Sequence, residues 1–283
     1  MKRTLGLHQT TAMDLTPVEL VRAAAAAGFD HVSLFTNNPV VPLDGHEDKF
    51  VFPRVTEGSK REVLDALATT GLTVVNAEFF LMRPDIEIMT YVPGLELGRE
   101  LGARHAVTHI FETEPARAVD MLGAFCDLAD AADMAVTIEF CPMTPGCKSI
   151  EQAAWFADQV SKANLGFGIC PMHLVRSGGT ATDVEKHADR YIRFGQVNDG
   201  FGLHSSTAYF DEVHDRELPG DGDFPLHDIL RALPPGAPIE VKIPRDSRIR
   251  SGAPAQAYIN EAFMRTRPIV DGLSTLKAYG QPT

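Results

Sequence analysis

The strongest constraint on this chain is a regular alternation of short apolar segments with longer segments of helical pattern. The apolar segments are rich in aliphatic and β-branched residues, which is typical of buried strands. The predicted strands are residues 4–7, 31–35, 72–80, 105–111, 135–140, 165–170, 192–198 and 238–243. The predicted helices are residues 18–27, 59–70, 92–101, 115–133, 149–163, 182–191, 225–233 and 255–273. Strand–helix units with short connections predict a parallel sheet.

Eight strands alternating with eight helices over about 250 residues predict an α/β fold, the (β/α)8 TIM barrel. An open doubly wound sheet is the alternative. It is disfavoured because no GxGxxG follows the first strand, and no Asp or Glu ends the second strand to hold a ribose. No low-complexity linker interrupts the chain, so we expect one domain over residues 1–283.

The composition argues against several classes of partner. The net charge of −12 disfavours a broad basic surface for nucleic acid. No apolar run reaches the ~18–20 residues that cross a membrane, and the one near the N-terminus is too short for a signal peptide. Because no cysteines form a CxxC pair, we expect free thiols. We therefore expect a cytoplasmic protein that binds a small-molecule substrate, without nucleic acid or membrane partners. The cysteines are Cys126, Cys141, Cys147 and Cys170.

Three long loops follow predicted strands, at residues 36–57, 141–148 and 199–224. In a barrel such loops lie at the carboxyl ends of the strands, where active sites are built. The third loop is predicted to form a lid. It contains the side chains His204, Tyr209, His214 and Arg216. Residues 166–179, GFGICPMHLVRSGG, predict a strand that ends in a loop presenting Cys170, His173 and Arg176.

Four predicted strands carry a polar side chain at or near their end. These residues are Glu139, Cys170, Gln196 and Glu240. A carboxylate among apolar neighbours is costly to bury alone, so a cation, an arginine or a shared proton is expected beside it. Two carboxylates that face each other across a cavity can act as base and acid beside a carbonyl group. A divalent metal between them would stabilise an enediolate, and oxygen ligands suit Mg, Mn or Co.

Further polar residues are expected to contact the substrate. His8 ends the first strand and His109 lies near the end of the fourth. A hydrogen-bonded structural role is the alternative for His109. We also assign Lys242, two residues beyond Glu240, to substrate binding.

Several motifs support a more specific interpretation: LGLHQTT at the start, IEF in the fifth strand, then CPMHLVRSGG, QVNDG, RELPGDGDFPL and IEV. With them the chain resembles the xylose-isomerase-like TIM-barrel superfamily of sugar phosphate isomerases and epimerases over nearly its whole length. Members typically carry Asp-x-x-His after the sixth strand, His or Gln in the seventh, and Glu in the fifth and eighth.

The resemblance implies roles for individual residues. Glu139, Cys170, Gln196 and Glu240 fall on the four metal-ligand positions. His173 falls on the substrate-binding or catalytic histidine. Arg216 precedes the Pro-Gly-x-Gly turn, where relatives contact a substrate anion. Gln196, in place of a histidine in the seventh strand, resembles the branch that includes hydroxypyruvate isomerases and 3-dehydroshikimate dehydratases. Relatives are often dimers or tetramers, so the resemblance also implies a homo-oligomer.

Cys170 departs from the Asp of this pattern, which leaves the metal open. The thiolate can ligate a softer metal such as Zn, since thiolate is a poor ligand for Mg. Alternatively, a hard metal is held weakly by three oxygens and water. In the third alternative the metal is lost, and Glu139 and Glu240 share a proton. His173, Lys242 or Arg216 then has to supply the electrophile.

These inferences predict an isomerase or epimerase that works through an enediolate on a small polyhydroxylated, sugar-like substrate. Glu139 and Glu240 are the predicted acid/base pair, with His173 as a further catalytic residue. The alternative is a dehydratase of the 3-dehydroshikimate or keto-inositol type, in which the same enolate expels a β-hydroxyl group. A second alternative is a degenerate barrel that binds a small molecule without turnover.

Overall fold

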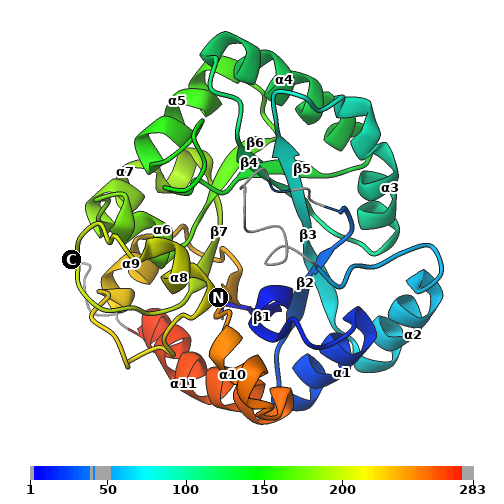
Figure 1. The fold of residues 1–283 in the computed structure, drawn as a ribbon, viewed down its shortest axis with the longest axis vertical. Helices are drawn as coiled ribbons and strands as arrows, with labels where there is room; N and C mark the ends of the chain where they lie inside the picture. Colours follow the sequence, from blue (N-terminus) through cyan, green and yellow to red (C-terminus); the bar gives the residue numbers. More distant parts are fainter. Residues whose placement is uncertain (1–2, 39–40, 42–51, 276–283) are drawn as a thin grey trace, which may run out of the picture.

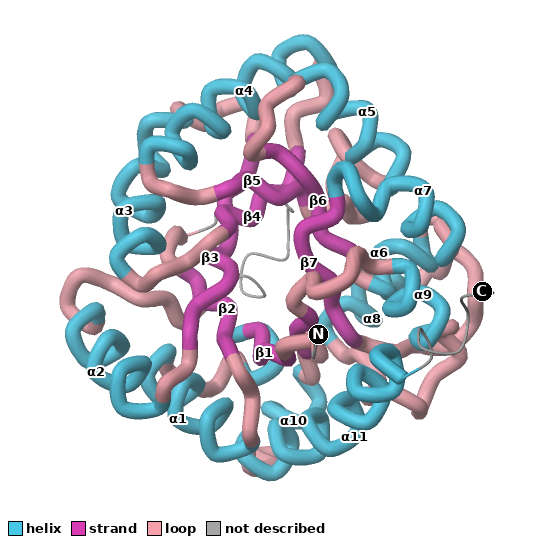
Figure 2. The backbone as a smooth tube through the Cα atoms, turned by 180° about the vertical axis from the view of Figure 1, so that it is seen from behind, coloured by secondary structure: helices cyan, strands magenta, loops and turns pink. Residues whose placement is uncertain are grey.

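The computed structural model describes residues 3–38, 41 and 52–275. Its parallel strands close into a barrel in chain order, from β1 to β8, and β8 pairs with β1. Figure 1 looks down the barrel, with helices in a ring around it, and Figure 2 shows the same arrangement from behind. The predicted (β/α)8 TIM barrel is therefore confirmed.

The strands are β1 Leu5–His8, β2 His31–Phe35, β3 Thr73–Met82, β4 His105–Ile110, β5 Ala135–Ile138, β6 Leu165–Ile169, β7 Ile192–Val197 and β8 Ile239–Val241. The helices are α1 Pro17–Ala27, α2 Lys60–Thr70, α3 Val92–Glu100, α4 Pro115–Ala131, α5 Ile150–Val160, α6 Pro171–Arg176, α7 Ala181–Tyr191, α8 Tyr209–His214, α9 Leu226–Ala232, α10 Asp246–Ser251 and α11 Ala255–Thr275. Among the described residues, 3-10 helices are formed by η1 Gln9–Ala12 and η3 Ile88–Tyr91.

Local sequence signals explain where these elements begin and end. At α1, Thr16 and Glu19 form a reciprocal capping box, and the helix ends at Gly28 with φ of 99°, a left-handed conformation that favours glycine. In β6, a Cβ on Gly168 would lie 2.5 Å from the ring of Phe194, so glycine leaves room for that ring. These signals set the lengths of the strand–helix units that close the barrel.

Each predicted strand and helix is present, with ends that differ by up to three residues. The helices α6, α8 and α10, each only six residues long, were not predicted from the sequence. All three follow strands of the second half of the barrel, and α10 has a single apolar side chain, Ile249, among its six residues. Of the first predicted loop, residues 39–40 and 42–51 lie outside the described residues.

The barrel places polar side chains in successive layers. Gln196 on β7 pairs in register with Glu240 on β8. Side chains two residues apart point to the same face of a strand, so Lys242 points inward as Glu240 does, about 6–7 Å nearer the carboxyl end. Gln196, Glu240 and Lys242 are all buried. The interior therefore offers one polar layer at the strand ends and another beneath it.

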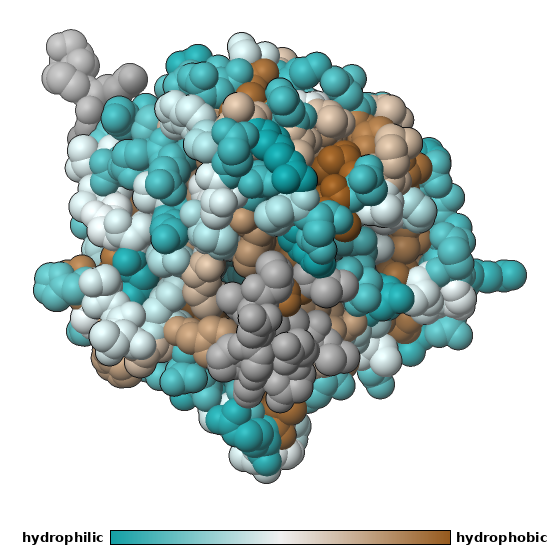
Figure 3. Space-filling view, turned by 45° about the horizontal axis from the view of Figure 1, so that its top comes forward, coloured by the Kyte–Doolittle hydropathy of each residue, from teal (hydrophilic) through white to brown (hydrophobic). Residues whose placement is uncertain are grey.

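Outside the barrel, the face in Figure 3 is largely hydrophilic, with hydrophobic residues in separate small groups. Among the residues described, none of the helices is both long and apolar enough to cross a membrane.

Candidate active site

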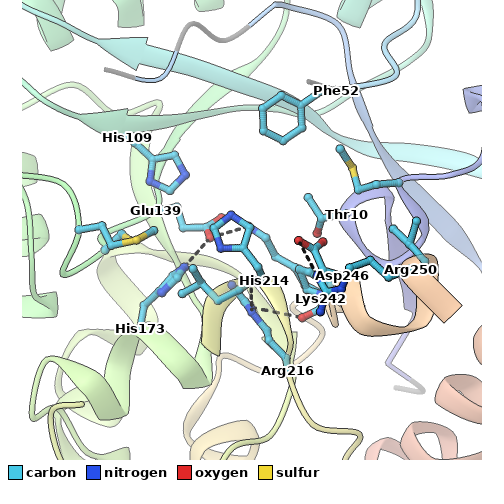
Figure 4. A pocket seen from close by; sticks show the side chains of 16 residues that line it. Thr10, Phe52, His109, Glu139, His173, His214, Arg216, Lys242, Asp246 and Arg250 are labelled. Atoms are coloured by element: carbon cyan, nitrogen blue, oxygen red, sulfur yellow. Dashed lines mark hydrogen bonds and ion pairs between the residues drawn. The ribbon is translucent and has the colours of Figure 1, made fainter. Parts of the chain in front are cut away.

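A cavity of about 370 Å³ lies at the carboxyl ends of the strands, within the size range of small-molecule sites. Its apolar lining includes Met13, Phe52, Met143, Val213, Pro244 and Ile249. Its polar lining includes Thr10, His109, Glu139, Cys141, His173, His214, Arg216, Lys242, Asp246 and Arg250. Figure 4 shows Glu139, His173 and Lys242 gathered on one side of this space. Four predicted site residues, His109, His173, Arg216 and Lys242, thus share the cavity with Glu139.

Glu139 is the centre of this group. It follows β5 and its side chain is buried, with Lys242 Nζ 2.5 Å and His173 Nε2 3.2 Å from its Oε1 atom. Gln196 Nε2 donates to Oε2 at 3.2 Å. Burial raises the pKa of Glu139, but the positive charge of Lys242 and the hydrogen bond from His173 outweigh it and hold the pKa well below its usual range. Glu139 is therefore an ionised carboxylate at neutral pH.

Lys242 is the cation nearest to this carboxylate. Burial lowers the pKa of Lys242, but the negative charges of Glu139 and Glu78 outweigh it and raise the pKa. An ammonium group consequently faces the cavity, 2.5 Å from a carboxylate, with both side chains nearly inaccessible to solvent.

His173 connects Glu139 to a second chain of side chains. It lies on α6, and Tyr209 Oη is 2.6 Å from its Nδ1 atom. Tyr209 Oη in turn lies 3.2 Å from Cys141 Sγ. Burial lowers the pKa of His173, but the negative charges of Cys170 and Cys141 and hydrogen bonds to them outweigh it and raise the pKa well above its ordinary value. A doubly protonated His173 can donate to Glu139 and to Tyr209 at the same time.

Cys170 caps α6 and is buried. Its Sγ accepts hydrogen bonds from Asn198 Nδ2 at 3.4 Å and from Arg216 Nη1 at 3.3 Å. Burial raises the pKa of the thiol, but the positive charges of His173 and Arg216 outweigh it and lower the pKa to about 6. Cys170 is thus a thiolate at neutral pH, held by a guanidinium group.

Arg216 also donates to the carbonyl oxygens of Val213 and Lys242. It lines the cavity, yet several of its donor hydrogens are already engaged by the protein. Its predicted contact with a substrate anion remains a prediction.

Glu240 lies in the deeper layer. Gln196 Nε2, which also donates to Glu139, donates to Glu240 Oε1 at 2.9 Å. Ser33 Oγ and Asn76 Nδ2 both donate to Glu240 Oε2. Burial raises the pKa of Glu240. The amide of Gln196 therefore separates the two glutamates that the sequence predicted as an acid/base pair.

His8 and Glu78 flank Glu240 in this layer. His8 Nε2 lies 3.3 Å from Glu78 Oε1, and both side chains are fully buried. Burial lowers the pKa of His8 to about 3 and raises that of Glu78 to about 8. His8 is thus placed below the cavity, whereas His109 lines it, with a pKa that burial lowers to about 4.

The long loop after β7 closes one side of the site. Its helix α8 brings Tyr209 to His173. The length of the loop predicted a lid, but it did not predict this contact. Arg176 does not point its charge at the cavity as expected. It donates instead to Glu212 and to the carbonyl oxygens of Phe201, Gly202 and His204. Arg176 thereby holds the loop against α6.

Two groups of side chains carry donor atoms of the kind that hold divalent cations. Glu139, Cys170 and His173 place one such atom each within 4.8 Å of one another, and so do His8, Glu78 and Glu240. The four positions implied by the resemblance are divided between these groups, with Gln196 between them.

Several solved structures share this fold. The IolI protein with a bound zinc atom matches with a TM-score of 0.76 and 18% identity, over 95% of this chain and 99% of that one. D-allulose 3-epimerase from Methylomonas sp. matches with a TM-score of 0.69 and 13% identity, over 95% of this chain and 99% of that one. L-ribulose 3-epimerase matches with 0.71 and 14%, over 100% of both chains. At such identities the likeness is one of fold.

Curated protein sequences gave no significant match. The sequence profile of the xylose isomerase-like TIM barrel family, in contrast, matches residues 21–266, and the chain belongs to that family.

Proposed function

We propose that this protein is an isomerase that transfers a proton beside the carbonyl group of a small polyhydroxylated substrate. The observation that carries the proposal is the buried, ionised Glu139 on the cavity wall, with Lys242 and His173 both at its Oε1 atom. Structural neighbours named as sugar epimerases lend support at the level of the fold.

In this reaction Glu139 acts as the base. Its carboxylate takes a proton from the carbon next to the carbonyl, and the electron pair of the broken C–H bond forms a carbon–carbon double bond. The carbonyl π electrons move to oxygen and give an enediolate. The proton of the adjacent hydroxyl group then passes to this oxyanion, and the proton held by Glu139 returns to the former carbonyl carbon. The double bond shifts to the second oxygen and forms the new carbonyl group, which completes an aldose–ketose type isomerisation.

His173 is better placed than Glu240 to assist Glu139. His173 lines the cavity, whereas Glu240 lies one layer deeper and accepts hydrogen bonds from Gln196, Ser33 and Asn76. His173 and Glu139 are adjacent, so they reach the same side of a bound substrate. Proton transfer on one face suits isomerisation, while epimerisation at a single carbon needs a donor on the opposite face.

A divalent metal does not fit the four implied ligand positions as these side chains are arranged. Lys242 contacts Glu139, Arg216 contacts Cys170, and Gln196 directs its amide nitrogen at both glutamates. These contacts put positive charge or N–H donors where a metal needs lone pairs. No step of the proposal is therefore assigned to a metal.

The test is product analysis with dihydroxyacetone, D-fructose, D-ribulose and hydroxypyruvate as probes. Wild-type protein should interconvert at least one ketose or keto acid with its aldehyde isomer. Glu139→Gln should lower the rate by at least about 100-fold, as expected for loss of a general base. A Glu139→Gln variant with undiminished activity would overturn the assignment.

Dehydration is the second candidate, and the protonated state of His173 favours it. With an acid and a base adjacent, Glu139 can take the α-proton, and His173 can give its proton to a β-hydroxyl as the C–O bond breaks and water leaves. The discriminating probe is 3-dehydroshikimate, because its dehydration product absorbs in the near ultraviolet. Formation of that product without any ketose isomerisation would select the dehydratase.

A further inference from the structure

We propose that the ammonium group of Lys242 is the built-in cation of this site, so that Lys242 and a divalent metal ion exclude each other. The catalytic part of this proposal rests on the proposed function, because it names the group that receives the charge of the enediolate. The structural part, the mutual exclusion, stands on the contacts alone.

The first contact is between Lys242 and Glu139. Lys242 enters the cavity from the end of β8, on the same face as Glu240, and its Nζ lies 2.5 Å from Glu139 Oε1. An ion that used this oxygen as a ligand would have to displace the ammonium group. If both stayed, a divalent ion would lie beside a positive charge in a site with little screening.

The second contact, between Arg216 and Cys170, leads to the same conclusion. Arg216 Nη1 and Asn198 Nδ2 both donate to the sulfur of Cys170. These two donors compete with a zinc ion for the lone pairs of the sulfur, and the charge of Arg216 opposes a second cation beside it. Cys170, which stands where relatives have an aspartate, is therefore already paired with the positive charge of Arg216.

The third contact concerns Gln196. Its Nε2 atom donates to both Glu139 and Glu240, whereas metal ligation needs the amide oxygen. Gln196 Oε1 is buried and has no hydrogen-bond partner among the described residues. A half-turn of this amide is thus the change that would expose a ligand oxygen once Lys242 is removed.

Lys242 can act on the substrate because it faces the cavity. When a carbonyl compound binds, its oxygen can take an N–H bond from Lys242 in exchange for Glu139. Glu139 is then released from its ion pair and becomes a stronger base. As the proton leaves carbon, the new negative charge on oxygen lies against the ammonium group, which is the role of electrostatic stabilisation.

The exclusion can be tested without a known substrate. The experiment is a titration of purified protein with cobalt(II), followed by visible absorption and calorimetry. The variants are Cys170→Asp, Lys242→Met and the double variant of both. We expect wild-type protein and Cys170→Asp to bind no cobalt specifically, because Lys242 remains in both. The double variant should bind one ion per chain, since it regains the carboxylate and loses the ammonium group.

Three results would overturn the exclusion. In the first, wild-type protein binds one cobalt ion with an affinity that Lys242→Met leaves unchanged. In the second, Cys170→Asp alone binds as tightly as the double variant. In the third, the double variant is folded by circular dichroism but binds no cobalt, so that Lys242 is not the group that keeps the ion out.

The catalytic part needs a turnover assay with a probe that the protein converts. Lys242→Met should lower kcat by at least about 100-fold, the scale for loss of one oxyanion-stabilising donor, with a smaller effect on KM. In Lys242→Ala, which removes the stem and leaves room for an added amine, methylammonium should restore part of kcat. An effect confined to KM, or no rescue, would make Lys242 a positioning residue only. If Glu139→Gln is fully active, the proposed function is wrong. The cobalt titration still tests whether Lys242 excludes a divalent metal ion.

Discussion

Removal of the Lys242 ammonium group should destabilise the protein through Glu139. In Lys242→Met the apolar stem is kept and the charge is lost, which leaves a buried carboxylate without its nearest cation. At 2.5 Å the gross attraction is about 6–7 kcal/mol for an effective dielectric constant of ~20. The desolvation of the ammonium group offsets part of this. Breaking a buried pair from one side typically costs about 3–5 kcal/mol, and we expect the lower end because His173 and Gln196 still donate to Glu139.

The assay is denaturation in guanidinium chloride at pH 7, followed by circular dichroism. The double variant Lys242→Met/Glu139→Gln should recover at least about 2 kcal/mol of the loss, because the uncompensated charge is gone. Lys162→Met is the matched control, since Lys162 pairs with Asp127 at the surface and should change stability little. Additive losses in the double variant, or a Lys242→Met variant as stable as Lys162→Met, would refute the reasoning.

The pH dependence of this loss has a defined sign. The pKa of Glu139 is depressed in the folded protein, so its contribution to stability is present above the unfolded pKa and is lost as pH falls through the folded pKa. Without Lys242 the carboxyl group takes up a proton more readily. The stability difference between wild type and Lys242→Met should therefore shrink from pH 7 to about pH 4.

Three further predictions test other parts of the site. Tyr209→Phe removes the hydroxyl group at His173 Nδ1 and should lower kcat about 10-fold or more with little change in KM, as measured in the turnover assay. Thiolate absorbance near 240 nm should titrate with a midpoint of about 6 in wild-type protein, and Cys170→Ser should abolish that step. Because burial raises the pKa of Glu78 to about 8, the folded state holds its proton above the unfolded pKa of 4.5, and stability falls as pH rises between these values. Glu78→Gln should flatten that fall in urea denaturation at pH 5 to 8.

The fold could be read from the sequence because the barrel repeats one strong pattern. The apolar runs at 31–35 and 72–80 each follow a helical segment that ends at a glycine, and this local pattern predicts strand and helix without reference to the rest of the chain. The short helix α6 could not be predicted in this way, because its six residues make fewer than two helical turns and give too short a window for a periodic pattern.

The candidate site was only partly predictable. Strand-end position singled out Glu139, Cys170, Gln196 and Glu240, since parallel strands bring their carboxyl ends together. Strand-end position could not show that Glu240 lies beneath the cavity, because the depth of a side chain in the barrel depends on the register between neighbouring strands. Tyr209 was visible only as a member of a long loop, and its contact with His173 depends on how Arg176 folds that loop against α6.

The most direct test of the account is deuterium exchange at the carbon beside the carbonyl, followed by proton NMR in heavy water with the converted probe. We predict that wild-type protein still catalyses the exchange after exhaustive treatment with a chelator, and that Glu139→Gln and Lys242→Met lose it. Exchange that stops on chelation and returns only with an added divalent metal would contradict the role of Lys242. Exchange that persists in Glu139→Gln would contradict the role of Glu139 as the base.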